Sequence, residues 1–306
     1  MSFDYDVLIV GAGSAGLSAA LTLGRCRRRV LLTGGGAPRN APSPAVHNFF
    51  TRDGIQPAAL LSLGYEQLAP YPTIEVKEAK IKSLTKLPKG FEAKGENAKG
   101  QAITLTARRV LLATGVEDVL PPLPGFRELW GSSVLHCPYC HGYEVRDQPL
   151  AVYGRGKAVV GLALLISRWS SDVVVVTDGP GHLTDYARER LRRQRITVRE
   201  EAIARLVGTA DGGMRCIEFT DGTYLERAAL FLHPEQEQRS TLAAELGAHH
   251  TSKGALWVNK NAQTTVAGLY AAGDMVPGQQ QALLAAASGS KAGICLNEGL
   301  TREECA

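Results

Sequence analysis

No run of about 18 apolar residues occurs in this 306-residue sequence, and its first residues, MSFDYDVLIV, lack the charged-then-apolar pattern of a leader. We therefore expect neither a membrane span nor secretion, and we expect a cytoplasmic location. The formal net charge is only +4, which suits acidic protein partners but is too small for a nucleic-acid binder. A hydrophobic content of 44% and the chain length predict a globular protein of about two domains.

Cysteines are few and mostly far apart. The six are too scattered for a framework of structural disulfides, and they are Cys26, Cys137, Cys140, Cys216, Cys295 and Cys305. A metal site would need a second Cys or His pair at a suitable spacing, and the histidines at 233, 249 and 250 do not supply one. We expect no metal, and we interpret Cys137 and Cys140, which are separated by two residues, as a redox pair.

The N-terminus carries a glycine motif in a setting that gives it meaning. An apolar strand is predicted over 5–10, followed by Gly11, Gly13 and Gly16 in the pattern GxGxxG and by a helix rich in Ala and Leu. Such a turn lets the backbone approach a pyrophosphate at the N-terminus of the helix. The acidic ribose ligand that usually ends the next strand is missing, because that strand ends in Thr33 and Gly34.

The same strand, glycine turn and helix plan recurs in the middle of the chain, from Pro149 to Gly179. It lies between a strand that ends in Ala113, Thr114 and Gly115 and a C-terminal strand that leads to Gly273 and Asp274. We therefore predict an α/β fold with two Rossmann-like dinucleotide-binding domains, the second inserted in the first. The expected segments are 1–117 and 240–306 for the first domain and 118–239 for the inserted one.

At these positions the sequence resembles the low-molecular-weight thioredoxin reductases, a family of flavoenzymes. The resemblance extends over nearly the whole chain: GAGSAG at 11–16, ATG at 113–115, CPYC at 137–140 and AAGD at 271–274, followed by Gln281 and Ala282. It implies a homodimer that binds FAD, with Asp274 on the ribityl chain and Gln281 and Ala282 at the flavin ring. The expected FAD-binding residues are Gly11, Gly13, Ala15, Gly16, Arg39, Asn40, His47, Ala113, Thr114, Gly115, Gly273, Asp274, Gln281 and Ala282. For Arg39, Asn40 and His47, an ordinary surface loop is the alternative.

The resemblance also implies that Cys140 lies against the flavin and that Cys137 exchanges with the substrate. Cysteines three positions apart at the start of a helix share one face, and the helix N-terminus favours the thiolate. The reductases have an Asp after the second cysteine, whereas this sequence has His141. A histidine can move a proton to or from a thiolate near neutral pH. We therefore predict that Cys137, Cys140 and His141 are catalytic, with simple packing as the alternative for His141.

The inserted domain departs from the NADPH-dependent members of the family. Its glycine turn, GRGKAV at 154–159, has Val159 at the packing position, which is expected to weaken the cradle. No basic residue follows the next strand, and Asp178 would repel a 2′-phosphate. Asp178 has an alternative role as an acceptor for the ribose of NADH. The motif CxxCHGxE resembles a branch without NADPH motifs, which contains ferredoxin-dependent flavin thioredoxin reductases and dithiol oxidases.

Three functions remain open from the sequence. The first is a thioredoxin-reductase-like enzyme that takes electrons from a protein such as ferredoxin and reduces thioredoxin or another disulfide. The basic run 187–195 favours it, because it offers a docking surface for acidic redox proteins. The second is an oxygen-dependent oxidase that forms a disulfide in a small dithiol. The third is a flavin-loaded sensor without turnover, against which the exchangeable cysteine pair argues.

Overall fold

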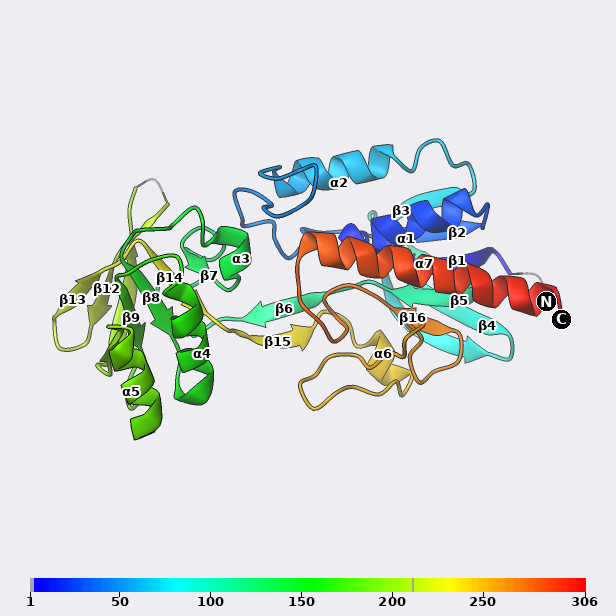
Figure 1. Ribbon diagram of the computed structural model, residues 1–306. Coiled ribbons are helices and arrows are strands. Elements are labelled where there is room, and N and C mark those ends of the chain that lie inside the picture. The colour runs from blue at the N-terminus through cyan, green and yellow to red at the C-terminus, as the bar shows by residue number, and fades with distance from the viewer. Residues whose placement is uncertain (1–2, 211) are drawn as a thin grey trace. The chain divides into compact units, whose positions relative to one another are not determined.

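The computed structural model describes residues 3–210 and 212–306 and divides the chain into two compact units (Figure 1). Unit 1 comprises residues 1–39, 49–117 and 236–306, and unit 2 comprises residues 40–48 and 118–235. The loop 40–48 therefore belongs with the inserted unit, whereas the sequence predicted an uninterrupted first segment. The reason is that side chains of this loop interact with residues 141–144 of the inserted unit. Among residues 3–210 and 212–306, no helix is long and apolar enough to cross a membrane.

Unit 1 is built on a sheet that contains the predicted N-terminal strand. Parallel pairing joins β3 to β2, β2 to β1, β1 to β5 and β5 to β16, and β4 runs antiparallel to both β3 and β5. The strands are β1 (Tyr5–Val10), β2 (Val30–Gly34), β3 (Ile74–Leu87), β4 (Gly90–Asn97), β5 (Ala102–Leu112) and β16 (Leu269–Ala271). The helices are α1 (Ser14–Arg25), α2 (Pro57–Glu66), α6 (Leu242–Glu245) and α7 (Ala282–Glu304).

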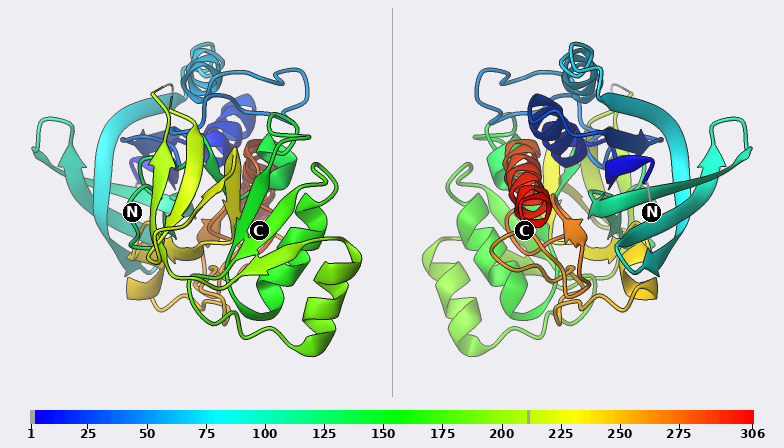
Figure 2. Two further views of the ribbon diagram at one scale, coloured as in Figure 1. Left: turned by 90° about the vertical axis from the view of Figure 1, so that its left-hand side faces the viewer. Right: turned by 90° about the vertical axis from the view of Figure 1, so that its right-hand side faces the viewer.

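One face of this sheet is covered by α1 and α7, which lie side by side in Figures 1 and 2. The small residues of α1 and α7 allow a close approach, and buried side chains such as Val7, Ile9 and Leu111 fill the space beneath them. Alternating apolar positions on β3, β4 and β5 form a second cluster on the other side. Both clusters fix the carboxyl ends of β1, β5 and β16, where the predicted FAD residues lie.

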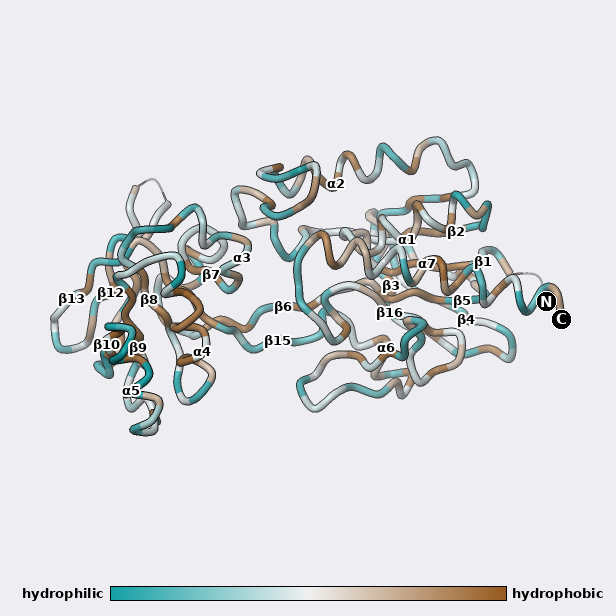
Figure 3. The backbone as a smooth tube through the Cα atoms, in the orientation of Figure 1, coloured by the Kyte–Doolittle hydropathy of each residue, from teal (hydrophilic) through white to brown (hydrophobic). Residues whose placement is uncertain are grey.

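Unit 2 contains a parallel five-stranded sheet of the order β10-β9-β8-β14-β7 and an antiparallel sheet of β11, β12 and β13. Its hydrophobic segments are mainly β8, β9, β14 and α4, which appear brown in Figure 3. The strands of the parallel sheet are β7 (Val134–Leu135), β8 (Leu150–Tyr153), β9 (Val173–Val176), β10 (Thr197–Arg199) and β14 (Ala229–Leu232). The antiparallel strands are β11 (Ile203–Gly208), β12 (Met214–Phe219) and β13 (Tyr224–Glu226). The helices are α3 (Pro138–His141), α4 (Gly156–Ile166) and α5 (Asp185–Arg193).

The two segments in which the chain passes between the units pair with each other. They are β6 (Val116–Val119) and β15 (Glu235–Gln238), which form a two-stranded ribbon. The predicted boundaries at 117 and 239 fall within or next to these strands.

Candidate active site

The first glycine turn of unit 1 has the shape that a pyrophosphate needs. Gly11 adopts a φ of 113°, and a Cβ atom there would lie 2.2 Å from the carbonyl oxygen of Ala113. A Cβ atom on Gly16 would lie 1.8 Å from the carbonyl oxygen of Gly11. Gly13, the N-cap residue of α1, has open space at the corresponding position and no side-chain cap. The first N–H groups of α1 are therefore accessible to an anionic group, which fits the dinucleotide cofactor expected there.

The C-terminal motif lies directly against this turn. Gly273 has a φ of 83°, and a Cβ atom on it would lie 2.9 Å from the Cβ atom of Ala15. The Thr114 hydroxyl lies 3.7 Å from the sulfur atom of Met275, so the ATG motif at 113–115 also lies against the C-terminal motif. Gln281 is the N-cap residue of α7 and Ala282 is its first residue. Three motifs that are far apart in sequence thus meet at one end of the sheet.

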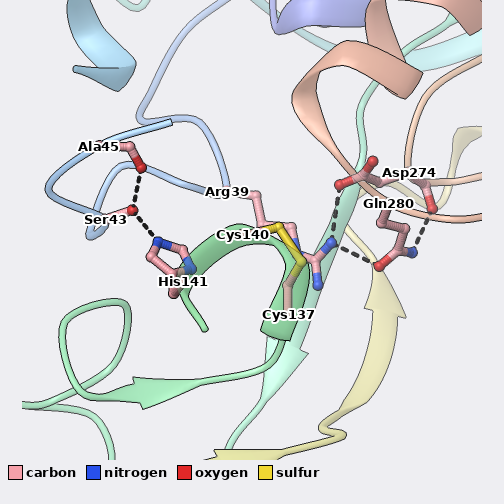
Figure 4. Close-up of a disulfide and its surroundings, with 8 residues drawn as sticks. All are labelled: Arg39, Ser43, Ala45, Cys137, Cys140, His141, Asp274 and Gln280. Carbon is pink, nitrogen blue, oxygen red and sulfur yellow. Dashed lines mark hydrogen bonds and ion pairs between the residues drawn. A yellow bond between two sulfur atoms is a disulfide. The ribbon is translucent and has the colours of Figure 1, made fainter. Parts of the chain in front are cut away.

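Arg39 and Asp274 form an ion pair within unit 1 (Figure 4). The Nη1 atom of Arg39 lies 3.0 Å from Oδ2 of Asp274 and 2.7 Å from Oε1 of Gln280. The side-chain amide of Gln280 also donates to the Asp274 carbonyl and to Gln236. Arg39 therefore neutralises the carboxylate that we expect to bind the ribityl chain, and it fixes the loop before α7.

The missing ribose ligand has a candidate on the neighbouring strand. Thr33 is fully buried and its hydroxyl donates to the carbonyl oxygen of Ile9, so it is not available. Parallel pairing of β2 with β3 places Glu78 opposite Gly34. A Cβ atom on Gly35 would lie 3.5 Å from Cγ and 3.9 Å from Oε1 of Glu78. Sequence analysis missed this carboxylate because only the pairing of two strands brings it to the turn.

In unit 2, Cys137 and Cys140 are joined by a disulfide whose Cα atoms are 5.3 Å apart (Figure 4). Cys137 is the N-cap residue of α3, and Pro138 is its first residue, which needs no amide hydrogen at that position. The helix has only four residues, and a Cβ atom on its C-cap residue, Gly142, would lie 2.5 Å from the carbonyl oxygen of Pro138. So short a helix has few aligned peptide dipoles, and its effect on a thiolate is smaller than the sequence suggested.

His141 follows the disulfide and is held by the loop 40–48. Its Nε2 atom lies 2.7 Å from the hydroxyl oxygen of Ser43, which is buried. The His47 ring lies edge-on to the His141 ring, with centroids 6.4 Å apart, and its Nε2 atom is 3.5 Å from Oε1 of Glu144. Burial lowers the pKa of His141, Glu144 acts in the opposite direction, and His47 lowers that pKa further.

The loop residues predicted to line the FAD site are thus divided. Arg39 belongs to unit 1, with Asp274, whereas Asn40 and His47 belong to unit 2. The carbonyl oxygen of Asn40 accepts a hydrogen bond from the Ser43 amide, and His47 interacts with Glu144. A role of Asn40 and His47 toward FAD remains a prediction.

A side chain from the glycine turn of unit 2 reaches the end of β9. Arg155, the residue between Gly154 and Gly156, donates from Nε to the carbonyl oxygen of Thr177 at 2.7 Å and from Nη2 to the carbonyl oxygen of Asp178. Its Nη2 atom also lies 3.7 Å from Oδ2 of Asp178. The other carboxylate oxygen of Asp178 accepts from the Ile203 amide at 2.8 Å. Asp178 is therefore engaged inside the unit, and its alternative role as a ribose ligand stays a prediction.

Val159 is compatible with formation of this turn and of α4, and its expected effect on nucleotide binding stays a prediction. It is buried in the core of unit 2, and α4 forms over its full length around it. The branched side chain fits, because even a Cβ atom added to Gly154 would lie 3.5 Å from the Val159 side chain, an ordinary van der Waals contact. The departure from a nucleotide-binding turn lies in Arg155 and Asp178.

These two units define a class of protein: oxidoreductases that act on sulfur groups and carry a dinucleotide cofactor. Comparison with known proteins then gives the family. The chain belongs to the pyridine nucleotide-disulphide oxidoreductase family, whose model matches residues 5–289.

Among similar proteins, a probable thioredoxin reductase of Arthroderma benhamiae is 29% identical, over 98% of this chain and 81% of the relative. The crystal structure of HlmI has a TM-score of 0.90 and 38% identity, and it covers 98% of this chain and 94% of that chain. A putative thioredoxin reductase from Bacillus anthracis also has a TM-score of 0.90, with 32% identity and 97% and 99% coverage. The α/β fold with Rossmann-like units is thereby confirmed, as is the resemblance to thioredoxin reductases.

FAD is the cofactor of the thioredoxin-reductase-like members of this family, and the residues present fit it. The fit rests on the glycine turn of unit 1, which is open at Gly13 and closed to any Cβ atom at Gly11 and Gly16. This chain is thus a thioredoxin-reductase-like flavin disulfide oxidoreductase.

Proposed function

We propose that this enzyme passes electrons between FAD and the Cys137–Cys140 disulfide without a pyridine nucleotide. The observation that carries the proposal is the position of Arg155. Its guanidinium group bonds to the carbonyl oxygens of Thr177 and Asp178, at the end of β9, where a nucleotide ribose would be expected. The carboxylate of Asp178 lies at the same place and offsets the charge of Arg155, which would otherwise attract the 2′-phosphate of NADPH. Both effects support a donor other than NADPH.

The proposed chemistry balances as a thiol–disulfide exchange. Bound FAD supplies the two-electron redox chemistry. Two electrons and two protons convert the Cys137–Cys140 disulfide into two thiols. The Cys137 thiolate attacks a substrate disulfide and releases one substrate thiolate, and Cys140 then attacks Cys137, which restores the internal disulfide and releases the second thiolate. His141 exchanges the protons that these steps require. The same steps in reverse oxidise a substrate dithiol.

The first candidate is reduction of thioredoxin or another protein disulfide, with electrons from a protein donor such as ferredoxin, by a cytoplasmic homodimer. The net charge of +4 supports acidic partners. Relatives whose names describe thioredoxin reductases support thioredoxin as the substrate.

The second candidate is an oxidase that transfers two electrons and two protons from a dithiol to oxygen, giving a disulfide and hydrogen peroxide. The observation in its favour is that two carboxylates offset part of the positive charge of the α5 arginines. Glu189 pairs with Arg192 and Arg193 at 2.8 Å each, and Arg188 pairs with Glu200 at 2.7 Å. The basic run therefore attracts an acidic donor protein less than its sequence suggested. A flavin sensor without turnover has no use for the disulfide, which argues against that third function.

Anaerobic flavin absorbance, with NADPH, NADH, reduced ferredoxin and a dithiol added separately, tests the proposal. Bleaching by ferredoxin with onward reduction of thioredoxin supports the first candidate. Bleaching by a dithiol, with recovery and peroxide formation in air, supports the second. Rapid bleaching by either pyridine nucleotide overturns the proposal. The variant Arg155→Ala extends the test, because it removes the guanidinium group but keeps Asp178. We expect it to gain affinity for NADH and not for NADPH.

A further inference from the structure

The hydrogen bonds around Ser43 determine which nitrogen of His141 carries a proton. The Ser43 hydroxyl lies 2.7 Å from the Ala45 carbonyl oxygen and 2.7 Å from Nε2 of His141 (Figure 4). A carbonyl oxygen only accepts, so the single hydroxyl proton is committed to Ala45. Ser43 can then only accept from His141, which requires that Nε2 carries a hydrogen.

The other ring nitrogen is left as the basic atom. In a neutral imidazole with hydrogen on Nε2, the lone pair is on Nδ1. This Nδ1 atom is buried and has no hydrogen-bond partner among residues 3–210 and 212–306. A buried nitrogen without a partner is costly for stability and therefore unusual. Its position in the residue next to Cys140 gives it a use, since the thiols of the reduced pair must gain and lose protons.

We propose that Ser43 is a positioning residue that holds His141 with hydrogen on Nε2, so that Nδ1 exchanges the proton with a thiol of the Cys137–Cys140 pair. The inference rests on the proposed function and adds a residue to the same site. In the step, the S–H bond breaks, an N–H bond forms at Nδ1, and the thiolate keeps the electron pair. The Nε2–H bond to Ser43 persists in both protonation states of the ring. Ser43 therefore keeps the ring oriented throughout the cycle.

Among the described residues, two titratable groups act on the His141 ring. His47, from the same loop as Ser43, lies edge-on to its ring, and Glu144, after α3, pairs with His47. Glu144 favours the charged form of His141, whereas burial and His47 disfavour it and lower its pKa. At neutral pH, His141 is therefore neutral and ready to accept a proton.

The tautomer can be measured without any turnover. In the oxidised holoenzyme labelled with ¹⁵N-histidine, the nitrogen shifts of His141, assigned with the variant His141→Gln, report which nitrogen carries the hydrogen. We expect hydrogen on Nε2 in the wild type and in Ser43→Thr, which keeps the hydroxyl. In Ser43→Ala, Nε2 loses its acceptor and the tautomer shifts toward hydrogen on Nδ1.

The rate of thiol exchange gives the second readout. Because the base is then misplaced, Ser43→Ala should be about tenfold slower and show a displaced pH profile, and Ser43→Thr should recover both. A matched control is Ser133→Ala, since Ser133 is buried in the same unit and its hydroxyl has no partner among the described residues. It should change neither readout.

Hydrogen on Nδ1 in the wild type would overturn the proposal. An unchanged rate and pH profile in Ser43→Ala would do the same, even with the expected tautomer. Failure of the proposed function looks different: the tautomer would be as expected, while no dithiol or protein donor reduces the flavin of the wild type.

Discussion

Gly289 of α7 touches the backbone of Ala15 in α1: a Cβ atom on Gly289 would lie 1.9 Å from the Ala15 carbonyl oxygen. This contact lies beside the glycine turn, because Ala15 belongs to the GAGSAG motif. The C-terminal helix thus holds the start of α1, where we expect the pyrophosphate of FAD to bind.

Gly289→Ala should therefore destabilise unit 1 strongly, because backbone atoms cannot move aside as a flexible side chain can. We expect the free energy of unfolding to fall by about 3 kcal/mol, the upper end of the usual cost of overpacking, measured by urea unfolding. The matched control is Gly161→Ala in α4, where the added Cβ atom meets nothing within 4 Å. It should raise the free energy of unfolding by about 0.5–1 kcal/mol. Equal stabilities of the two variants would contradict the close contact of α1 with α7.

Glu78 should contribute to FAD affinity as an acceptor for a ribose hydroxyl at Gly35. A hydrogen bond contributes about 1.5–3 kcal/mol with a charged acceptor and about 0.5–1.5 kcal/mol with a neutral one. Glu78→Gln keeps an acceptor oxygen but loses the charge, so it should weaken FAD binding by about tenfold. Flavin fluorescence gives the dissociation constant. Glu75→Gln is the control on the same strand, since Glu75 pairs with Lys77 instead. If both variants bind FAD as the wild type does, another group holds the ribose.

Cys137→Ser should abolish exchange with dithiols and disulfides and leave the bound flavin in place, because the nucleophile is lost and unit 1 is untouched. We expect a fall of at least about 100-fold in turnover, measured by dithiol consumption with flavin absorbance as the loading control. Cys26→Ser removes an exposed free thiol and should keep full activity. Full activity of Cys137→Ser with every acceptor would refute the redox pair.

The end of α7 should give the protein an acid-sensitive component of stability. Hydrogen bonds from Arg28 and then Arg108 hold the pKa of Glu304 below its usual value of 4.5. A carboxyl group whose pKa is lowered by folding stabilises the protein above the unfolded pKa, and this contribution disappears as the pH falls through the folded value. Glu304→Gln should therefore unfold at lower urea than the wild type at about pH 7, with a smaller difference at about pH 3.5. Glu298→Gln, whose partner Arg302 is 3.8 Å away and exposed, should differ little at either pH.

Local patterns in the sequence were sufficient for the two strand, glycine turn and helix units. The turn at Gly11 and the helix after it depend mainly on residues that are close together in the sequence. The structure confirms both the turn and the helix. The turn at Gly154 also forms, but the sequence could not reveal that the Arg155 side chain reaches from it to the end of β9. That outcome depends on carbonyl groups of β9, which the sheet brings within reach.

Contacts across long sequence separations were the ones that sequence analysis missed. Ser43 and His141 are 98 positions apart and meet only because the loop 40–48 folds with unit 2. No periodicity or motif marks a serine as the partner of a histidine. Glu78 is a similar case, since its place beside Gly35 follows from the register of two parallel strands.

The membership of residues 40–48 in unit 2 means that the chain crosses between the units four times, at 39/40, 48/49, 117/118 and 235/236. In a chimera that takes only residues 118–235 from a relative, the relative's CxxC segment would therefore meet Ser43 and His47 of this chain. Unit 2 is therefore discontinuous in sequence. A graft that is meant to keep Ser43 together with His141 must include the loop 40–48 as well as residues 118–235.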